Sequence, residues 1–143
     1  MKKNNLIAKA TTTINALRSD IWDALTTPES IKQYMFGTDV TSKFYEGSPI
    51  VWRGEWQGKV YEDKGKVMKV DPGRVFQFSH YSPLSGLPDR PDNYHIVTIE
   101  LIDKGGEVKV VLTQDKNLTE EASQHSEKNW QMVLDALKQL VEG

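Results

Sequence analysis

The segment from 50 to 56, IVWRGEW, alternates between apolar or small residues and more polar ones. Successive side chains of a strand point to opposite faces, so this pattern predicts a half-buried strand. Trp52 and Trp56 are then expected side by side on its inner face. Gly54 lies between them and contributes no side chain, which we interpret as space on that face.

Similar alternation recurs along much of the chain. A β-branched segment from 5 to 15 predicts a first strand, and the region from Thr38 to Asp115 predicts about six more, joined by turns rich in glycine and proline. We interpret Gly65 as the mark of a bulge. Short strands with frequent turns are typical of an antiparallel sheet. The inward side chains predicted for the last three strands are Phe76, Phe78, His80, His95, Val97, Ile99, Leu101, Val108, Val110, Leu112 and Gln114.

Two short helices are expected directly after the first strand. Ser19 can cap the first of them, which should end before Pro28 because the residue before proline avoids helical angles. Thr27, Pro28 and Glu29 then provide a cap, a proline at the first position and an acidic residue for the helix dipole.

The last 25 residues predict one long amphipathic helix. Thr119 is its expected cap, and the segment contains no proline. Its apolar stripe at helical spacing comprises Ala122, Ser126, Trp130, Val133, Leu134, Leu137 and Val141. The order of elements therefore predicts an α+β fold in which a curved antiparallel sheet buries one face against this helix. The helix cannot contact every inward side chain of a curved sheet, so we expect a cavity between them.

Composition narrows the possible functions. The 143 residues include 18 basic and 20 acidic residues, for a formal net charge of −2. Such a balance disfavours a nucleic-acid partner or an anionic membrane surface, which require concentrated basic charge. The chain has no cysteine, which excludes disulfides and thiolate catalysis. We find no signal peptide or membrane-spanning pattern and expect a cytoplasmic protein.

Four segments in order resemble a known family. They are TINALRSDIWDALTTPESIKQYM, GKVMKVDPGRVFQFSH, VTIELIDKGGEVKVVLTQ and NWQMVLDALKQLVEG, which together span nearly the whole chain. The sequence resembles the START-like, helix-grip superfamily (SRPBCC, Bet v 1-like), and within it the homologues of the activator of the 90-kDa heat-shock protein ATPase. The chain departs from the family pattern at Tyr34, where tryptophan is common, and at Asn129, where glycine is common.

The resemblance implies one START-like domain over residues 1–143, with seven strands around a long C-terminal helix and an apolar cavity between them. It implies binding of a small hydrophobic molecule, with no assigned catalysis and no cofactor. The name-giving co-chaperone has a separate N-terminal domain that this sequence does not show, so a chaperone partner is not transferred by name.

Candidate site residues follow from the inward faces. We expect apolar walls and polar anchors from Trp52, Trp56, Phe76, Phe78, His80, His95, Val97, Leu112, Gln114, Trp130 and Val133. Each histidine can be a structural residue, a ligand anchor or an acid–base catalyst. No third histidine or cysteine accompanies His80 and His95, and His125 belongs to the polar side of the helix, so no metal site is expected. Glu62 and Asp63 are adjacent and point to opposite faces of a strand, which disfavours paired-carboxylate chemistry.

Three functions stay open at this stage. The first is a binding module for a small aromatic, polyketide-like or lipid molecule; the second is a cyclase or dehydratase that uses His80 or His95 in the same cavity. The third is a co-chaperone-like interaction domain. A space between sheet and helix that is filled by side chains would overturn the first two together. The protein is expected to be a monomer or a weak homodimer.

The loop from Ser82 to Asn93 is the most unusual local feature. It contains three prolines and is expected to expose Leu84 and Leu87. Loops of this length are often lids or binding loops. It can be a lid over the cavity, a subunit contact or a rigid connection.

Overall fold

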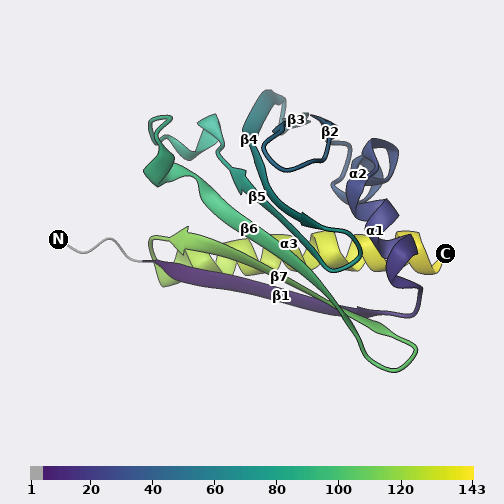
Figure 1. Ribbon diagram of the computed structural model, residues 1–143. Coiled ribbons are helices and arrows are strands. Elements are labelled where there is room, and N and C mark those ends of the chain that lie inside the picture. Colours follow the sequence, from purple (N-terminus) through teal and green to yellow (C-terminus); the bar gives the residue numbers. More distant parts are fainter. Residues whose placement is uncertain (1–4) are drawn as a thin grey trace.

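The computed structural model describes residues 5–143, except the side chain of Trp56 (Figure 1). No helix in this described part is long and apolar enough to span a membrane. The elements in order are β1 (Leu6–Ile14), α1 (Arg18–Thr26), α2 (Pro28–Tyr34), β2 (Asp39–Ser42), β3 (Pro49–Trp56), β4 (Lys59–Asp71), β5 (Val75–His80), the 3-10 turns η1 (Pro83–Ser85) and η2 (Pro91–Asn93), β6 (His95–Asp103), β7 (Val108–Asn117) and α3 (Glu120–Glu142).

The seven described strands form one antiparallel sheet in the order β1-β7-β6-β5-β4-β3-β2. Figure 1 shows α3 behind the curved sheet, with α1 and α2 near the C-terminal end of α3. We call the face toward α3 the inner face and the opposite face the outer face. The helix-grip α+β fold expected from the sequence is confirmed.

Alternation along the strands separates the two faces as predicted. The buried core combines inward strand residues with helix residues such as Leu134 and Leu137, each at most 1% exposed. Burying side chains of this size stabilises a fold by about 1.5–3 kcal/mol each. The inward strand residues in the core include Ile50, Trp52, Phe76, Phe78, Val97, Ile99, Leu101, Val108, Val110 and Leu112.

Side chains of α3 cover the open edge of β1. Glu127 accepts a hydrogen bond from the Lys9 amide at 3.1 Å, and Gln131 donates to the Thr11 carbonyl at 3.0 Å. Lys138 and Glu142 continue the series at the Thr13 carbonyl and the Asn15 amide. Edge strands are open to pairing with other chains unless something covers them, so α3 protects this edge as well as the core.

Two helix details differ from expectation. Helix α1 begins at Arg18 after Leu17, and Ser19 makes no cap because it already lies inside the first turn. Thr119 caps α3 as predicted, by accepting a hydrogen bond from the Ala122 amide at 3.0 Å. The buried stripe of α3 includes Ser123, whereas Ala122 is exposed in the first turn.

The two glycine interpretations were wrong. A Cβ on Gly54 would lie within 3 Å of the Tyr61 ring, so that ring fills the place interpreted as space. Gly65 is not the bulge, which lies between Val67 and Lys69. A Cβ on Gly65 would lie 1.7 Å from the Ser79 carbonyl oxygen, so Gly65 allows two strands to approach closely.

Candidate functional site

A small apolar cavity lies between the inner face and α3. Its volume is about 30 Å³. A water molecule occupies about 30 Å³ in the liquid, so the space between sheet and helix is nearly filled by side chains. The lining residues come from the sheet, all three helices and the loop before β3: Leu25, Ile31, Tyr34, Met35, Phe44, Ile50, Trp52, Phe76, Phe78, Ile99, Leu112, Trp130, Val133, Leu134 and Leu137.

The structure brings six of the predicted site residues to this cavity. They are Trp52, Phe76, Phe78, Leu112, Trp130 and Val133. Val97 is fully buried on the same face but is not part of the lining, and neither are His80, His95 and Gln114. The side chain of Trp56 lies outside the described residues.

Trp52 connects the cavity to a polar edge. Its ring lies 5.2 Å from the Phe78 ring and 5.0 Å from the His80 ring, measured between centroids. Both contacts are within the range in which aromatic pairs attract each other. The tryptophan is 4% exposed, and it contacts both Phe78, which lines the cavity, and His80, which does not.

His80 is paired with Asp63, which was not among the predicted site residues. Its Nε2 lies 3.0 Å from Oδ2 of Asp63. Oδ1 of Asp63 is buried and has no hydrogen-bond partner among the described residues. A buried oxygen without a donor is destabilising, so this atom is a candidate for contact with a ligand. Alternation with the core residue Val67 could have placed Asp63 on the inner face, but it could not have shown the pairing with His80.

His95 and Gln114 already have partners within the protein. His95 Nδ1 lies 2.8 Å from the Asp115 carbonyl oxygen, which assigns the ring proton to Nδ1. Gln114 is 8% exposed and accepts a hydrogen bond from Trp130 Nε1 at 2.5 Å. Both residues therefore hold neighbouring elements in place, whereas the His80–Asp63 pair retains an acceptor without a partner among the described residues.

Nine of the lining residues were not among the predicted site residues, and α2 with Met35 directly after it contributes three of them. Ile31, Tyr34 and Met35 have the spacing of one helix face, which was the available signal. Burial raises the pKa of Tyr34 above its ordinary value, and its hydroxyl donates to the Leu25 carbonyl at 3.2 Å. Tyr34 is therefore part of the cavity wall, whereas Asn129 is exposed and contributes nothing to it.

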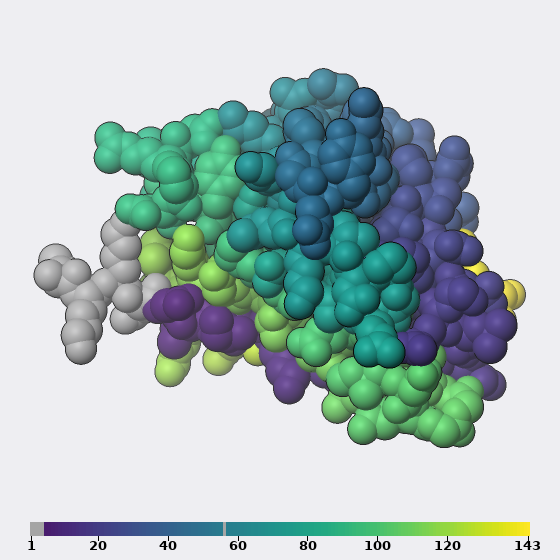
Figure 2. Space-filling view, viewed as in Figure 1, coloured from purple at the N-terminus to yellow at the C-terminus, as the bar shows by residue number. Residues whose placement is uncertain are grey.

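The loop from 82 to 94 does not contribute to this cavity. Leu84 and Leu87 are exposed, as predicted. Asp89 forms an ion pair with Lys64, and Pro91 and Tyr94 help to line a separate groove. In Figure 2 the loop projects at the upper left of the molecule.

No metal-binding cluster is seen in the described part of the chain, where no group of three or more His, Cys, Asp or Glu side chains could hold an ion.

Comparisons with known proteins place this geometry in a family. The family model for Activator of Hsp90 ATPase homolog 1-like protein matches residues 15–142. The solution structure of ChR145 from Cytophaga hutchinsonii is 51% identical, with a TM-score of 0.85, and the match covers 99% of this chain and 97% of that one. No curated protein gives a significant match.

Two more distant structures share the fold. The Aha1 dimer from Colwellia psychrerythraea is 20% identical with a TM-score of 0.74, and the match covers 96% of each chain. CalU16 from Micromonospora echinospora is 17% identical with a TM-score of 0.71, covering 99% of this chain and 87% of that one. The family-model match and the ChR145 likeness together show that this chain belongs to the Activator of Hsp90 ATPase homolog 1-like family.

Proposed function

We propose that the protein binds a small, neutral, ring-containing molecule with a hydroxyl group between the sheet and α3. The observation that carries the proposal is the cavity itself, which is enclosed by apolar side chains from the sheet and from all three helices. Ligand sites are mostly apolar and aromatic, with a few polar groups that fix orientation.

A ligand of this kind requires the cavity to widen. The volume of about 30 Å³ is far below the roughly 300–1,000 Å³ of ligand sites in general. Met35 and Phe44 are the wall residues best placed to move, because both are only partly buried and belong to the short segments around α2 and β2. Phe44 also has a φ of 56°, a conformation that L-residues adopt at an energetic cost. We therefore place the entrance between these two side chains.

The polar edge supports a hydroxyl on the ligand. Asp63 Oδ1 is buried without a donor among the described residues, while its Oδ2 is paired with His80. Asp63 and His80 do not line the closed cavity, so a ligand hydroxyl would reach Oδ1 only where the ligand ring displaces part of the Trp52–His80 contact. A second negative charge beside Asp63 would be repelled, which favours a neutral ligand.

The test is an NMR titration of the full chain with 2-naphthol, which is neutral at pH 7. We expect saturable shifts of the Trp52 and Trp130 indole N–H signals, since both rings line the cavity. Trp52→Phe should weaken binding, because it removes one large aromatic wall. The matched control is Trp22→Phe: Trp22 packs edge-on against Phe76 at 6.2 Å but does not line the cavity.

Asp63→Asn with 2-methylnaphthalene as a second probe tests the hydroxyl contact. The wild type should prefer 2-naphthol over 2-methylnaphthalene, and the variant should lose that preference. Equal binding of the two probes by the wild type would contradict the role of Asp63. Absence of any shift at Trp52 and Trp130 would contradict the cavity proposal as a whole.

One observation favours an enzyme as the second candidate. His80 is oriented by the Asp63 carboxylate, the arrangement that holds a histidine in place for general acid–base catalysis. His95 is its partner across the β5–β6 pair and also points inward. Replacing His80 with Gln separates the two functions, because an enzyme would lose turnover of a bound compound while a binding module would keep its affinity.

A further inference from the structure

A second concavity, larger than the inner cavity, lies on the other side of the sheet. We call it the outer groove; its volume is about 630 Å³, within the size range of small-molecule sites. Strands β4 to β7 form its floor and the loop after β5 forms one wall. The lining residues are Lys64, Gly65, Lys66, Met68, Ser79, Asp89, Pro91, Tyr94, Ile96 and Lys116.

A bulge in β7 brings Lys116 into this groove. By simple alternation Lys116 would share the inner face with Gln114. Its φ of 56° is left-handed, and the β1–β7 register shifts between Leu6 and Ala8. Its amide donates to Asn5 Oδ1 at 2.7 Å, which holds the bulge. Non-glycine residues in this conformation are uncommon, and bulges often re-aim a side chain at functional sites.

The loop wall of the groove is held rigidly. Asp89 accepts from Lys64 Nζ at 2.5 Å and from the Tyr94 hydroxyl at 2.6 Å. The Tyr94 ring stacks on Tyr81 with 5.2 Å between centroids, and the Tyr81 hydroxyl donates to the Leu87 carbonyl at 2.6 Å. A preformed wall reduces the ordering cost of binding.

The charge of the groove is unbalanced. Of its three lysines, Lys64 is paired with Asp89, the one carboxylate in the lining. Lys66 and Lys116 form no ion pair within residues 5–143 that the structure describes. The whole chain has a net charge of −2, so this positive patch is local. Met68, Pro91, Tyr94 and Ile96 provide the apolar surface beside it.

From this geometry we propose that the outer groove is a second binding site, for a free small aromatic carboxylate. The ring would lie against Met68, Tyr94 and Ile96, and the carboxylate would lie between the ammonium groups of Lys66 and Lys116. This site does not depend on the proposed function of the inner cavity, because the sheet separates the two and they share no lining residue.

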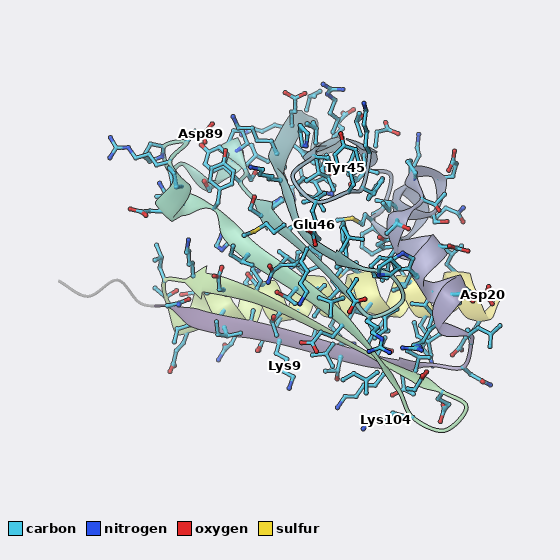
Figure 3. The ribbon with its side chains drawn as sticks, viewed as in Figure 1. Lys9, Asp20, Tyr45, Glu46, Asp89 and Lys104 are labelled. Atoms are coloured by element: carbon cyan, nitrogen blue, oxygen red, sulfur yellow. The ribbon has the colours of Figure 1, made fainter. Side chains whose placement is uncertain are left out.

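The test is a titration of the full chain with 2-naphthoate at low ionic strength, followed by backbone amide shifts. We expect saturable shifts at Gly65, Lys66, Ile96 and Lys116, and weaker binding in 0.5 M salt. The double variant Lys66→Ala with Lys116→Ala should raise the dissociation constant by about fivefold or more, the loss expected for two partly exposed charge pairs. Lys104→Ala is the matched control, since Figure 3 places Lys104 at the hairpin tip far from Asp89.

Each alternative outcome overturns the proposal. Neutral 2-naphthamide shifting the same amides with equal affinity would show that charge has no role. An equal loss of affinity in Lys104→Ala would show only a general attraction of anions. Shifts at Trp52 and Trp130 alone would assign 2-naphthoate to the inner cavity, and no saturable shift at all would remove the site.

Discussion

The two faces of one sheet differ in how they are covered. On the inner face α3 packs along the strands and leaves about 30 Å³, whereas the outer groove of about 630 Å³ is bounded only by the loop after β5. The inner lining is almost entirely apolar, while the outer lining carries three lysines and one aspartate. The packing of α3 against one face, rather than the composition of the strands, therefore decides which face of the sheet has open volume.

The two faces also differ in what a ligand must displace in order to bind. A ligand inside has to displace packed side chains, and interiors packed to this density resist such displacement. A ligand outside would displace water from a preformed surface. We therefore expect slow binding at the apolar inner site and fast, charge-dependent binding at the outer groove.

Replacing Gly65 should have the largest effect, because both faces depend on this position. In Gly65→Ala the new Cβ would lie 1.7 Å from the Ser79 carbonyl oxygen, between the Lys64–Tyr81 bridge and the Val67–Phe78 pair that hold the two backbones together. We expect a loss of about 4 kcal/mol in the free energy of unfolding. Urea denaturation measures it. Lys66→Ala is the control, and similar stability of the two variants would contradict the close approach.

Truncating Leu137 should enlarge the inner cavity alone. This side chain is fully buried and lines the cavity. Leu137→Ala should cost about 3 kcal/mol in the free energy of unfolding, within the range for buried leucines. Binding of 2-naphthol should become tighter and faster, with 2-naphthoate binding unchanged. Weaker 2-naphthol binding by a folded Leu137→Ala protein would show that the cavity is not the site.

A smaller effect is expected at Tyr34. In Tyr34→Phe the Leu25 carbonyl loses its 3.2 Å hydrogen bond from a buried hydroxyl while the ring stays in the wall. The free energy of unfolding should fall by about 1 kcal/mol, as for a typical buried hydrogen bond. Thermal unfolding followed by circular dichroism measures this change, and an unaltered midpoint would contradict the contribution of that bond.

The smallest effect is expected when the pH is lowered and Asp89, in the loop that forms one wall of the outer groove, becomes protonated. The hydrogen bond from Lys64, together with that from Tyr94, holds the pKa of Asp89 below its ordinary value. A lowered carboxyl pKa stabilises the loop fully above about pH 3.9, the ordinary value, and the contribution is lost as pH falls through the lowered pKa. Amide exchange of residues 87–94 should therefore rise in strong acid before the core unfolds. Asp89→Asn should show the faster exchange already at pH 7.

The sequence was sufficient to predict most of the inner face. Period-two alternation placed Trp52, Phe78 and Leu112 inward, and the helical stripe placed Trp130 and Leu137 against them. These predictions succeed because burial acts on each strand or helix separately, and its period can be seen within one element.

Contacts that depend on how two strands pair could not be predicted from the periodicity of a single strand or helix. The partner of His80 is Asp63, which becomes its neighbour only through the register of β4 and β5. Lys116 reaches the outer groove through a bulge that breaks the alternation. Gly54 was interpreted as space because its cross-strand partner, Tyr61, could not be known. Register and bulges are set by the whole sheet, so one segment does not reveal them.

The most direct test of the account compares two probes with the same ring on one wild-type sample. Amide and indole shifts are recorded with 2-naphthol and then with 2-naphthoate. We expect 2-naphthol to shift the signals of Trp52 and Trp130 on the inner face, and 2-naphthoate to shift those of Gly65 and Lys116 in the outer groove. Both probes shifting the same set of residues would contradict the assignment of different chemistry to the two faces.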